Sequence, residues 1–203
     1  MDAPELIAVR AALAEGVKPS TFLLVEGGSD KAALETLAAR RGRDLEVEGV
    51  SIIPMGGATT IGHFLDLLGP HGHDFRLAGL CDAGEEGDFR RELERAGMGI
   101  HPTRPDMASA GFFVCVTDLE DELIRALGPD AVVEIIDAQG ELGSFCTLQR
   151  QPFHRDRTIE QVLWRFMGTR SGRKSTYARL LVEALDLDRV PPPLDGVLEY
   201  AKP

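Results

Sequence analysis

The chain has 203 residues and a net charge of −11, and this length fits one domain with a substantial C-terminal extension. Its content of 43% hydrophobic and 27% charged residues is ordinary for a soluble globular protein. No run of about 18 apolar residues is present, and the acidic N-terminus lacks the pattern of a signal peptide. Cys81, Cys115 and Cys146 form no Cys-x-x-Cys pair, so we expect reduced thiols, buried at Cys81 and Cys115, in a cytoplasmic protein without a membrane segment.

The negative net charge argues against general affinity for nucleic acid, because a negative field repels phosphates. The charge is uneven, however, since residues 148–179 contain eight basic side chains and only two acidic ones. An acidic body with one basic segment is what a carboxylate metal site beside a phosphate-binding surface would produce. Ordinary unevenness of surface charge explains the same pattern equally well.

Four short apolar segments predict buried strands, at residues 21–25, 47–55, 76–81 and 111–116. Helices are expected around and between them, at residues 5–15, 31–41, 59 or 60 to 68, 85–96 and 119–127. Strands that alternate with helices across short glycine turns predict an α/β fold with a mostly parallel central sheet, flanked by helices.

The pattern changes after Asp137. We expect residues 1–137 to form the α/β core with its N-terminal helix, and residues 138–203 to form a basic, mainly helical extension packed on that core. Helices are predicted at 159–167 and 175–185, whereas 140–149 is weakly patterned and the proline triplet at 191–193 is expected to break the chain.

Acidic residues follow three of the predicted strands: Glu26, Asp82 and Asp118. Because ligands of parallel sheets bind beyond the carboxyl ends of the strands, these side chains are expected along one edge. Asp30 lies four residues after Glu26, and Glu120 lies close behind Asp118. Converging carboxylates repel one another and are relieved by a cation, and oxygen ligands favour Mg²⁺ or Mn²⁺. The alternative is that Asp30 only caps a helix and Glu26 is a solvated strand-end acid.

Several other residues could either contact nucleic acid or serve only the fold. Gly56 and Gly57 either let a phosphate approach the backbone or simply form a tight turn. Trp164 is expected to pack in the core rather than to stack on a base, and His154 is expected on the surface.

Three ordered motifs resemble the Toprim domain: Leu-Val-Glu-Gly-Gly-Ser-Asp-Lys at 24–31, Pro-Met-Gly-Gly-Ala at 54–58 and Gly-Leu-Cys-Asp at 79–82. Asp-Leu-Glu at 118–120, followed by Lys174, is most similar to the Toprim half of the OLD (overcoming lysogenization defect) family nucleases. The resemblance covers roughly residues 21–185 and implies a Toprim-like Rossmannoid fold with a helical C-terminal extension.

What this resemblance implies is a metal-dependent nuclease that uses Mg²⁺ or Mn²⁺. Its metal ligands would be Glu26, Asp30, Asp82, Asp118 and Glu120. Glu26 would also act as a general acid or base, and Lys174 would stabilise charge on the cleaved phosphate. The residues expected to bind phosphate or nucleic acid are Gly56, Gly57, Arg170 and Arg173. DNA is the expected partner, with RNA, a partner ATPase and a homodimer left open.

The chain departs from the family at two points. The usual Asp-x-Asp is Asp82-Ala83-Gly84 here, so the second acid is missing; Glu85, Glu86 or Asp88 would replace it or would only favour a helix dipole. The phosphate-loop motif of the OLD ATPase domain is also missing, so any ATPase must come from a partner. The alternative function is therefore a catalytically weak Toprim module that binds metal or nucleic acid and acts through such a partner.

Overall fold

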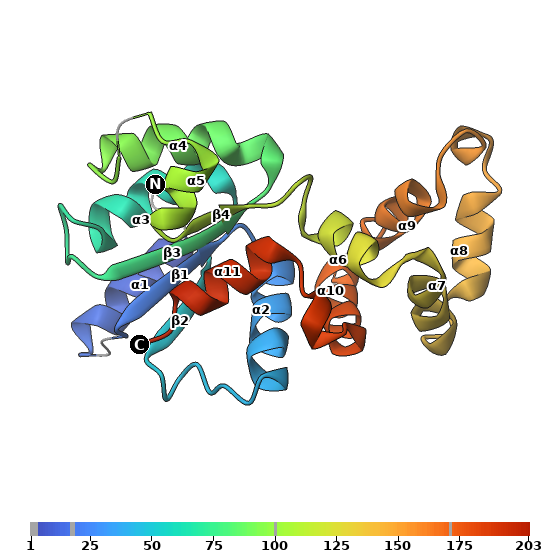
Figure 1. Cartoon of the computed structure of the whole chain (residues 1–203), viewed down its shortest axis with the longest axis horizontal. Coiled ribbons are helices and arrows are strands. Elements are labelled where there is room, and N and C mark those ends of the chain that lie inside the picture. Colours follow the sequence, from blue (N-terminus) through green and yellow to red (C-terminus); the bar gives the residue numbers. More distant parts are fainter. Residues whose placement is uncertain (1–3, 17–18, 100, 171) are drawn as a thin grey trace.

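The structure is a computed structural model that describes residues 4–16, 19–99, 101–170 and 172–203. A parallel four-stranded sheet with the order β2-β1-β3-β4 lies at its centre (Figure 1). The strands are β1 (Thr21–Val25), β2 (Val50–Pro54), β3 (Arg76–Cys81) and β4 (Phe112–Val114). Because all neighbouring strands run parallel, their carboxyl ends share one edge, and the predicted α/β fold with a parallel central sheet is confirmed.

Strand β1 explains why the sheet has two hydrophobic layers. All five of its residues are buried, and successive side chains point to opposite faces. Phe22 and Leu24 enter one core cluster, while Leu23 and Val25 enter the other. A continuous apolar run is therefore what this central strand requires, since helices cover both of its faces.

Four of the helices that precede β4 in the chain cover one face of the sheet, and Figure 1 shows them above and to the left of the strands. These are α1 (Pro4–Ala14), α3 (Ile61–Leu68), α4 (Glu86–Arg95) and α5 (Arg104–Ser109). Helix α2 (Gly28–Arg40) covers the opposite face, where its residues join the larger cluster. Cys81 and Cys115 are buried free thiols, as expected.

The remaining helices form a lobe beside the carboxyl edge of the sheet, and the last of them leads the chain back to the sheet (Figure 1). They are α6 (Leu119–Leu127), α7 (Pro129–Ala138), α8 (Leu142–Gln149), α9 (Ile159–Met167), α10 (Arg173–Ala184) and α11 (Pro192–Tyr200). Helix α10 packs along α2, and α11 lies against β3 and β4. Across the described ranges, we find no helix long and apolar enough to cross a membrane.

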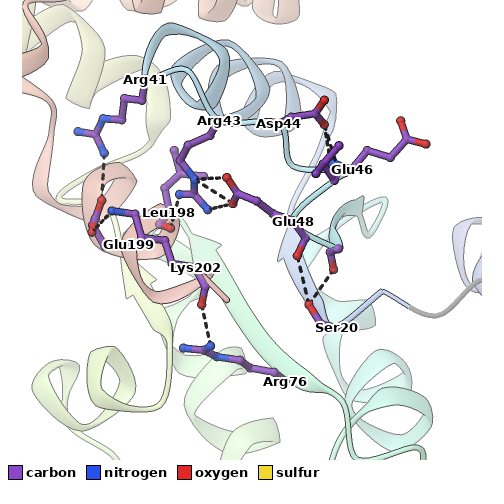
Figure 2. A network of polar contacts seen from close by, with 12 residues as sticks. Ser20, Arg41, Arg43, Asp44, Glu46, Glu48, Arg76, Leu198, Glu199 and Lys202 are labelled. Carbon is purple, nitrogen blue, oxygen red and sulfur yellow. Dashed lines mark hydrogen bonds and ion pairs between the residues drawn. The ribbon is translucent and has the colours of Figure 1, made fainter.

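Figure 2 shows the polar contacts between the C-terminal residues and the rest of the α/β core. Arg43 donates to the backbone carbonyl of Leu198 at 2.7 Å and also pairs with Glu48. Arg76, at the start of β3, donates to the carbonyl of Lys202 at 2.8 Å. These contacts attach α11 and the C-terminus to the loop after α2 and to the start of β3.

Several helices differ from the expectation. The proline triplet does not break the chain, because Pro192 and Pro193 occupy the first turn of α11, where a missing N–H costs no hydrogen bond. Pro129 starts α7 in the same way, and α5 and α8 are likewise helices that the sequence patterns did not predict. Strand β2 begins later than expected, because residues 45–49 turn and leave Val47 84% exposed.

Candidate metal centre at the carboxyl edge of the sheet

A pocket of about 310 Å³ lies where β1 and β3 end. Four of the five predicted carboxylates and the predicted lysine line it: Glu26, Asp30, Asp82, Glu120 and Lys174. Two of them directly follow β1 and β3, and the others lie on α2, α6 and α10, so the pocket lies between the sheet and the helical lobe. The common edge that the strand pattern predicts therefore brings these side chains together.

Glu26 directly follows β1, and its position is fixed by the glycine pair after β2. The N–H groups of Gly56 and Gly57 both donate to the backbone carbonyl of Glu26, at 3.1 and 3.2 Å. The glycines have φ values of 76° and 131°, which other residues rarely adopt. Both N–H groups are thus already used within the chain, and the Glu5 carboxylate lies beside Gly56. The pair lines the pocket, but its N–H groups are not directed at a phosphate.

Asp30 both caps helix α2 and lines the pocket. Its Oδ2 accepts the N–H of Gly27 at 2.9 Å and so caps the first turn of α2. The side chain also faces the pocket and the residue is only 7% exposed. Burial, followed by the negative charges of Glu120 and Glu26, raises the pKa of Asp30 to about 7.

Asp82 directly follows β3 and is half-buried. Burial raises the pKa of Asp82 to about 8, with further contributions from the charges of Asp30, Glu26 and other nearby acids. A carboxyl group with such a pKa holds a proton at neutral pH until a cation takes the place of that proton.

Glu120 lies in the first turn of α6 and is 3% exposed. Its Oε2 accepts a hydrogen bond from Lys174 Nζ at 3.0 Å, whereas its Oε1 is buried without a hydrogen-bond partner. Burial raises the pKa of Glu120, and the charge of Lys174 only partly offsets this effect. A buried carboxylate oxygen without a donor is costly, and a cation in the pocket would satisfy it.

The donor set fits Mg²⁺ or Mn²⁺, because it consists of carboxylate oxygens. In the part of the chain that the structure describes, no three His, Cys, Asp or Glu side chains already converge into a complete ligand set. The arrangement is thus an acidic pocket with one orphaned oxygen and not a closed ligand cage.

Asp118 lies behind the pocket. Its Oδ1 accepts the N–H of Asp121 at 2.8 Å and caps α6, while its Oδ2 accepts the indole N–H of Trp164. Both oxygens are therefore occupied within the chain, and Asp118 positions the first turn that carries Glu120. Trp164 is 39% exposed, so the expectation of a core residue is wrong. Sequence patterns missed this pair, because its members lie 46 residues apart.

Arg170 and Arg173 do not reach the pocket. Arg173 is 7% exposed, donates to Glu141 Oε1 at 2.6 Å, and lies 4.1 Å over the ring of Phe166. Arg170 is exposed, and its nearest acid is also Glu141, at 3.4 Å. Burial leaves Arg173 little surface with which to bind phosphate. His154 is likewise buried, at 4% exposed, which corrects the expectation of a surface histidine.

A parallel sheet with acids after β1 and β3, a glycine pair after β2 and an acidic helix start beyond β4 defines a Toprim-like domain. Residues 20–83 match the family model described as overcoming lysogenization defect protein-like, TOPRIM domain. This match confirms the predicted Toprim domain and its likeness to the OLD family.

Solved structures extend the likeness of the fold over most of the chain. The C-terminal region of the Xanthomonas campestris pv. campestris OLD protein matches with a TM-score of 0.66 and 20% identity, over 90% of this chain and 94% of that one. The C-terminal region of the Burkholderia pseudomallei OLD protein matches with a TM-score of 0.67 and 20% identity, over 90% of this chain and 97% of that one. Among curated proteins, none matches this chain.

Proposed function

We propose that this protein is a divalent-metal-dependent nuclease that nicks or cleaves DNA. The observation that carries the proposal is the pocket that Glu26, Asp30, Asp82 and Glu120 line together with Lys174, with one oxygen of Glu120 buried and unpaired. The OLD-like Toprim match over residues 20–83 supports a role in metal binding and nucleic-acid chemistry.

In this proposal the four pocket carboxylates hold Mg²⁺ or Mn²⁺. When bound, the cation supplies Lewis-acid activation of the phosphate and lowers the pKa of a bound water. Asp118 contributes through its negative charge and through its cap on α6, which places Glu120 at the pocket. The predicted direct ligand role of Asp118 would require it to release Trp164 or Asp121.

Lys174 and Glu26 have the positions required for charge stabilisation and proton transfer. Lys174 Nζ reaches the pocket from the first turn of α10, and its side chain is 48% exposed, so an incoming phosphate can contact it. An ammonium group suits this role because it is a compact cation. Glu26 is half-buried at the end of β1, open to solvent on one side, and so can exchange a proton with a reacting group.

Exposed basic residues on the helical lobe support a nucleic-acid substrate. Arg150, Arg155 and Arg165 are exposed and form no ion pair with any described residue. Arg157 lies 4.6 Å over the ring of Phe153, which is 73% exposed. Arg165 directly follows Trp164, the partner of Asp118, so the lobe presents exposed cationic and aromatic groups to which a nucleic acid could bind.

A second candidate function is supported by Gly84. The chain lacks the second acid of Asp-x-Asp at that position, and a pocket with fewer ligands suits a module that binds metal or nucleic acid without efficient cleavage. Such a module would act through a partner ATPase. Cleavage by the isolated chain distinguishes the two candidates.

The test is incubation of supercoiled plasmid with the full chain and Mn²⁺, beside Glu26→Ala, Lys174→Ala and the control Lys31→Ala. Lys31 pairs with Glu35 on the surface of α2 and lies outside the set of residues assigned to the chemistry. We expect nicked or linear product from the wild type and the control, and almost none from the other two variants. Equal products from all four proteins, or no cleavage at high protein concentration, would show that the catalytic proposal is wrong. A parallel RNA substrate tests the substrate class.

A further inference from the structure

Two aromatic side chains lie on the surface of the helical lobe. Among the large hydrophobic residues that are exposed in the described part of the chain, Phe153 and Trp164 are the aromatic ones, at 73% and 39% exposed. Phe153 belongs to the 3-10 turn Pro152–His154, and Trp164 belongs to α9. Each exposed ring offers a flat apolar face that a planar ligand can cover.

The packing of the lobe places both rings on the outside. In the 3-10 turn, His154 is 4% exposed, so it anchors the turn and leaves its neighbour Phe153 in solvent. The side of α9 that packs inward carries Val162, Leu163, Phe166 and Met167. Trp164 lies outside this apolar side of the helix. The exposure of the two rings therefore follows from which neighbours the turn and the helix bury.

The polar contacts of the two rings favour a ligand that stacks. The indole N–H of Trp164 donates to Asp118 Oδ2. Since this N–H is the only donor of the indole, Trp164 has none left with which to read the edge of a base. Arg157 lies 4.6 Å over the ring of Phe153, which places a cation beside an aromatic face. Stacking on a ring tolerates every base, whereas sequence is read from base edges.

Cations accompany the rings along the same segment. Residues 150–165 contain four arginines and only two acids, and Arg150, Arg155 and Arg165 are exposed. Cations that track phosphates, together with rings that stack on bases, are typical of proteins that bind single strands. In a duplex, the face of each base is covered by its neighbours in the stack, so a base must leave the stack before a side chain can cover it. The combination therefore fits a strand without base pairing.

Trp164 also links this surface to the pocket at the carboxyl edge of the sheet. Asp118, its hydrogen-bond partner, caps α6. The next two residues, Leu119 and Glu120, line the pocket. A base stacked on Trp164 would thus contact a side chain that is hydrogen-bonded to the start of the helix that forms this part of the pocket.

We propose that Phe153 and Trp164 stack on unpaired bases, and that the substrate is a nucleic acid with a single-stranded stretch. This inference deepens the proposed function and rests on its nucleic-acid substrate. The arginines of residues 150–165 contact the phosphates, and the two rings contact the bases. Sequence preference is weak, because the rings do not read base edges.

The test is binding of labelled oligo-dT to the full chain in EDTA, measured by fluorescence anisotropy. Trp164→Gln keeps an N–H donor for Asp118 but loses the ring, and we expect it to weaken binding about tenfold. Trp164→Phe keeps a ring and loses the donor, and it is expected to bind nearly as the wild type does. Phe153→Leu should weaken binding as Trp164→Gln does, whereas the exposed control Val47→Ala should not.

Three further measurements complete the test. Trp164 is the single tryptophan of the chain, so unlabelled oligo-dT should quench the intrinsic fluorescence of the wild type. A duplex of the same length should bind equally well to the wild type and to the ring variants. Oligo-U shows whether the unpaired strand is DNA or RNA, and ring-dependent binding of either strand supports the inference. Thermal melting checks that each variant is folded.

The outcomes separate this inference from the function beneath it. If Trp164→Gln binds oligo-dT as tightly as the wild type, or if Trp164→Phe is the weaker of the two, Trp164 only holds Asp118 and the inference is wrong. Equal losses of affinity for the strand and for the duplex would also overturn it. Because EDTA removes the metal, ring-dependent binding without plasmid cleavage overturns only the nuclease proposal. Cleavage together with ring-independent binding overturns only the inference.

Discussion

Lys174 Nζ lies 3.0 Å from Glu120 Oε2, and this ion pair joins two helices that are far apart in the sequence. It links the first turn of α6 to the first turn of α10 and so closes the pocket on the side of the lobe. Since the other oxygen of Glu120 has no partner, the pair neutralises only part of a buried carboxylate. A cation that binds in the pocket would therefore interact favourably with the remaining oxygen of Glu120.

Lys174→Ala removes the cation from this pair and leaves the buried Glu120 carboxylate without its cationic partner. We expect cleavage to be lost and the free energy of unfolding to fall by about 1 kcal/mol, because a buried acceptor loses its donor. Adding Glu120→Gln to this variant is expected to restore stability but not cleavage. Urea unfolding and plasmid assays measure the two effects separately. A single variant that is as stable and as active as the wild type would contradict both roles.

The pKa values of Asp30 and Asp82 predict how the stability of the metal-free chain depends on pH. Burial and neighbouring acids raise the two pKa values to about 7 and about 8, from an ordinary aspartate value of 3.8. The folded chain then binds more protons than the unfolded chain between roughly pH 4 and pH 8. Stability is therefore expected to fall as the pH rises through this window. Urea unfolding in EDTA at several pH values should show a shallower fall for Asp82→Asn, and identical slopes would contradict the assignment.

The same two carboxyl groups predict that metal binding releases protons. A cation in the pocket replaces the protons that Asp30 and Asp82 hold near neutral pH, so Mn²⁺ affinity should rise from pH 6 to pH 8.5. Titrations at pH 7 in two buffers with different ionisation enthalpies measure the proton release directly. The same apparent binding enthalpy in both buffers would show that no proton is displaced.

The strand ends were predictable from the sequence, but the partners of the side chains were not. The apolar run of β1 followed by Glu26 and a glycine pair indicates a strand, its carboxyl end and an acid at that end. Nothing in the local pattern links Asp118 to Trp164, or Arg173 to Glu141, because these pairs form only when the lobe packs against itself. The sequence therefore placed Arg173 among the expected phosphate-binding residues, whereas in the structure its side chain is buried within the lobe.

Glu141 has a structural role in the lobe. Its Oε1 accepts from Arg173 at 2.6 Å, and its Oε2 accepts from Tyr177 at 2.8 Å. Glu141→Ala removes the carboxylate partner of the buried Arg173, and we expect it to lower the free energy of unfolding by about 2–3 kcal/mol. Because Glu141 lies outside the pocket, metal affinity of the folded variant should not change. Denaturant unfolding and Mn²⁺ titration check the two statements; a large loss of affinity at unchanged stability would contradict them.

Arg165 tests the proposed surface for nucleic acid. Arg165→Ala is expected to weaken DNA binding and to reduce the slope of log affinity against log salt by about 1, because one phosphate contact is lost. Arg179→Ala is the matched control, since Arg179 already pairs with Glu183 on α10. Fluorescence anisotropy with labelled DNA at several salt concentrations measures both slopes. If the two variants behave alike, α9 is not the binding surface.

The central claim is that the pocket at the carboxyl edge of the sheet holds a divalent cation. Calorimetric titration of Mn²⁺ into the wild type, Asp82→Ala and the exposed control Asp130→Ala tests it most directly. The account predicts a saturable isotherm for the wild type and for Asp130→Ala, and loss of binding for Asp82→Ala. An isotherm that Asp82→Ala leaves unchanged, or a wild type that takes up no Mn²⁺, would contradict the claim.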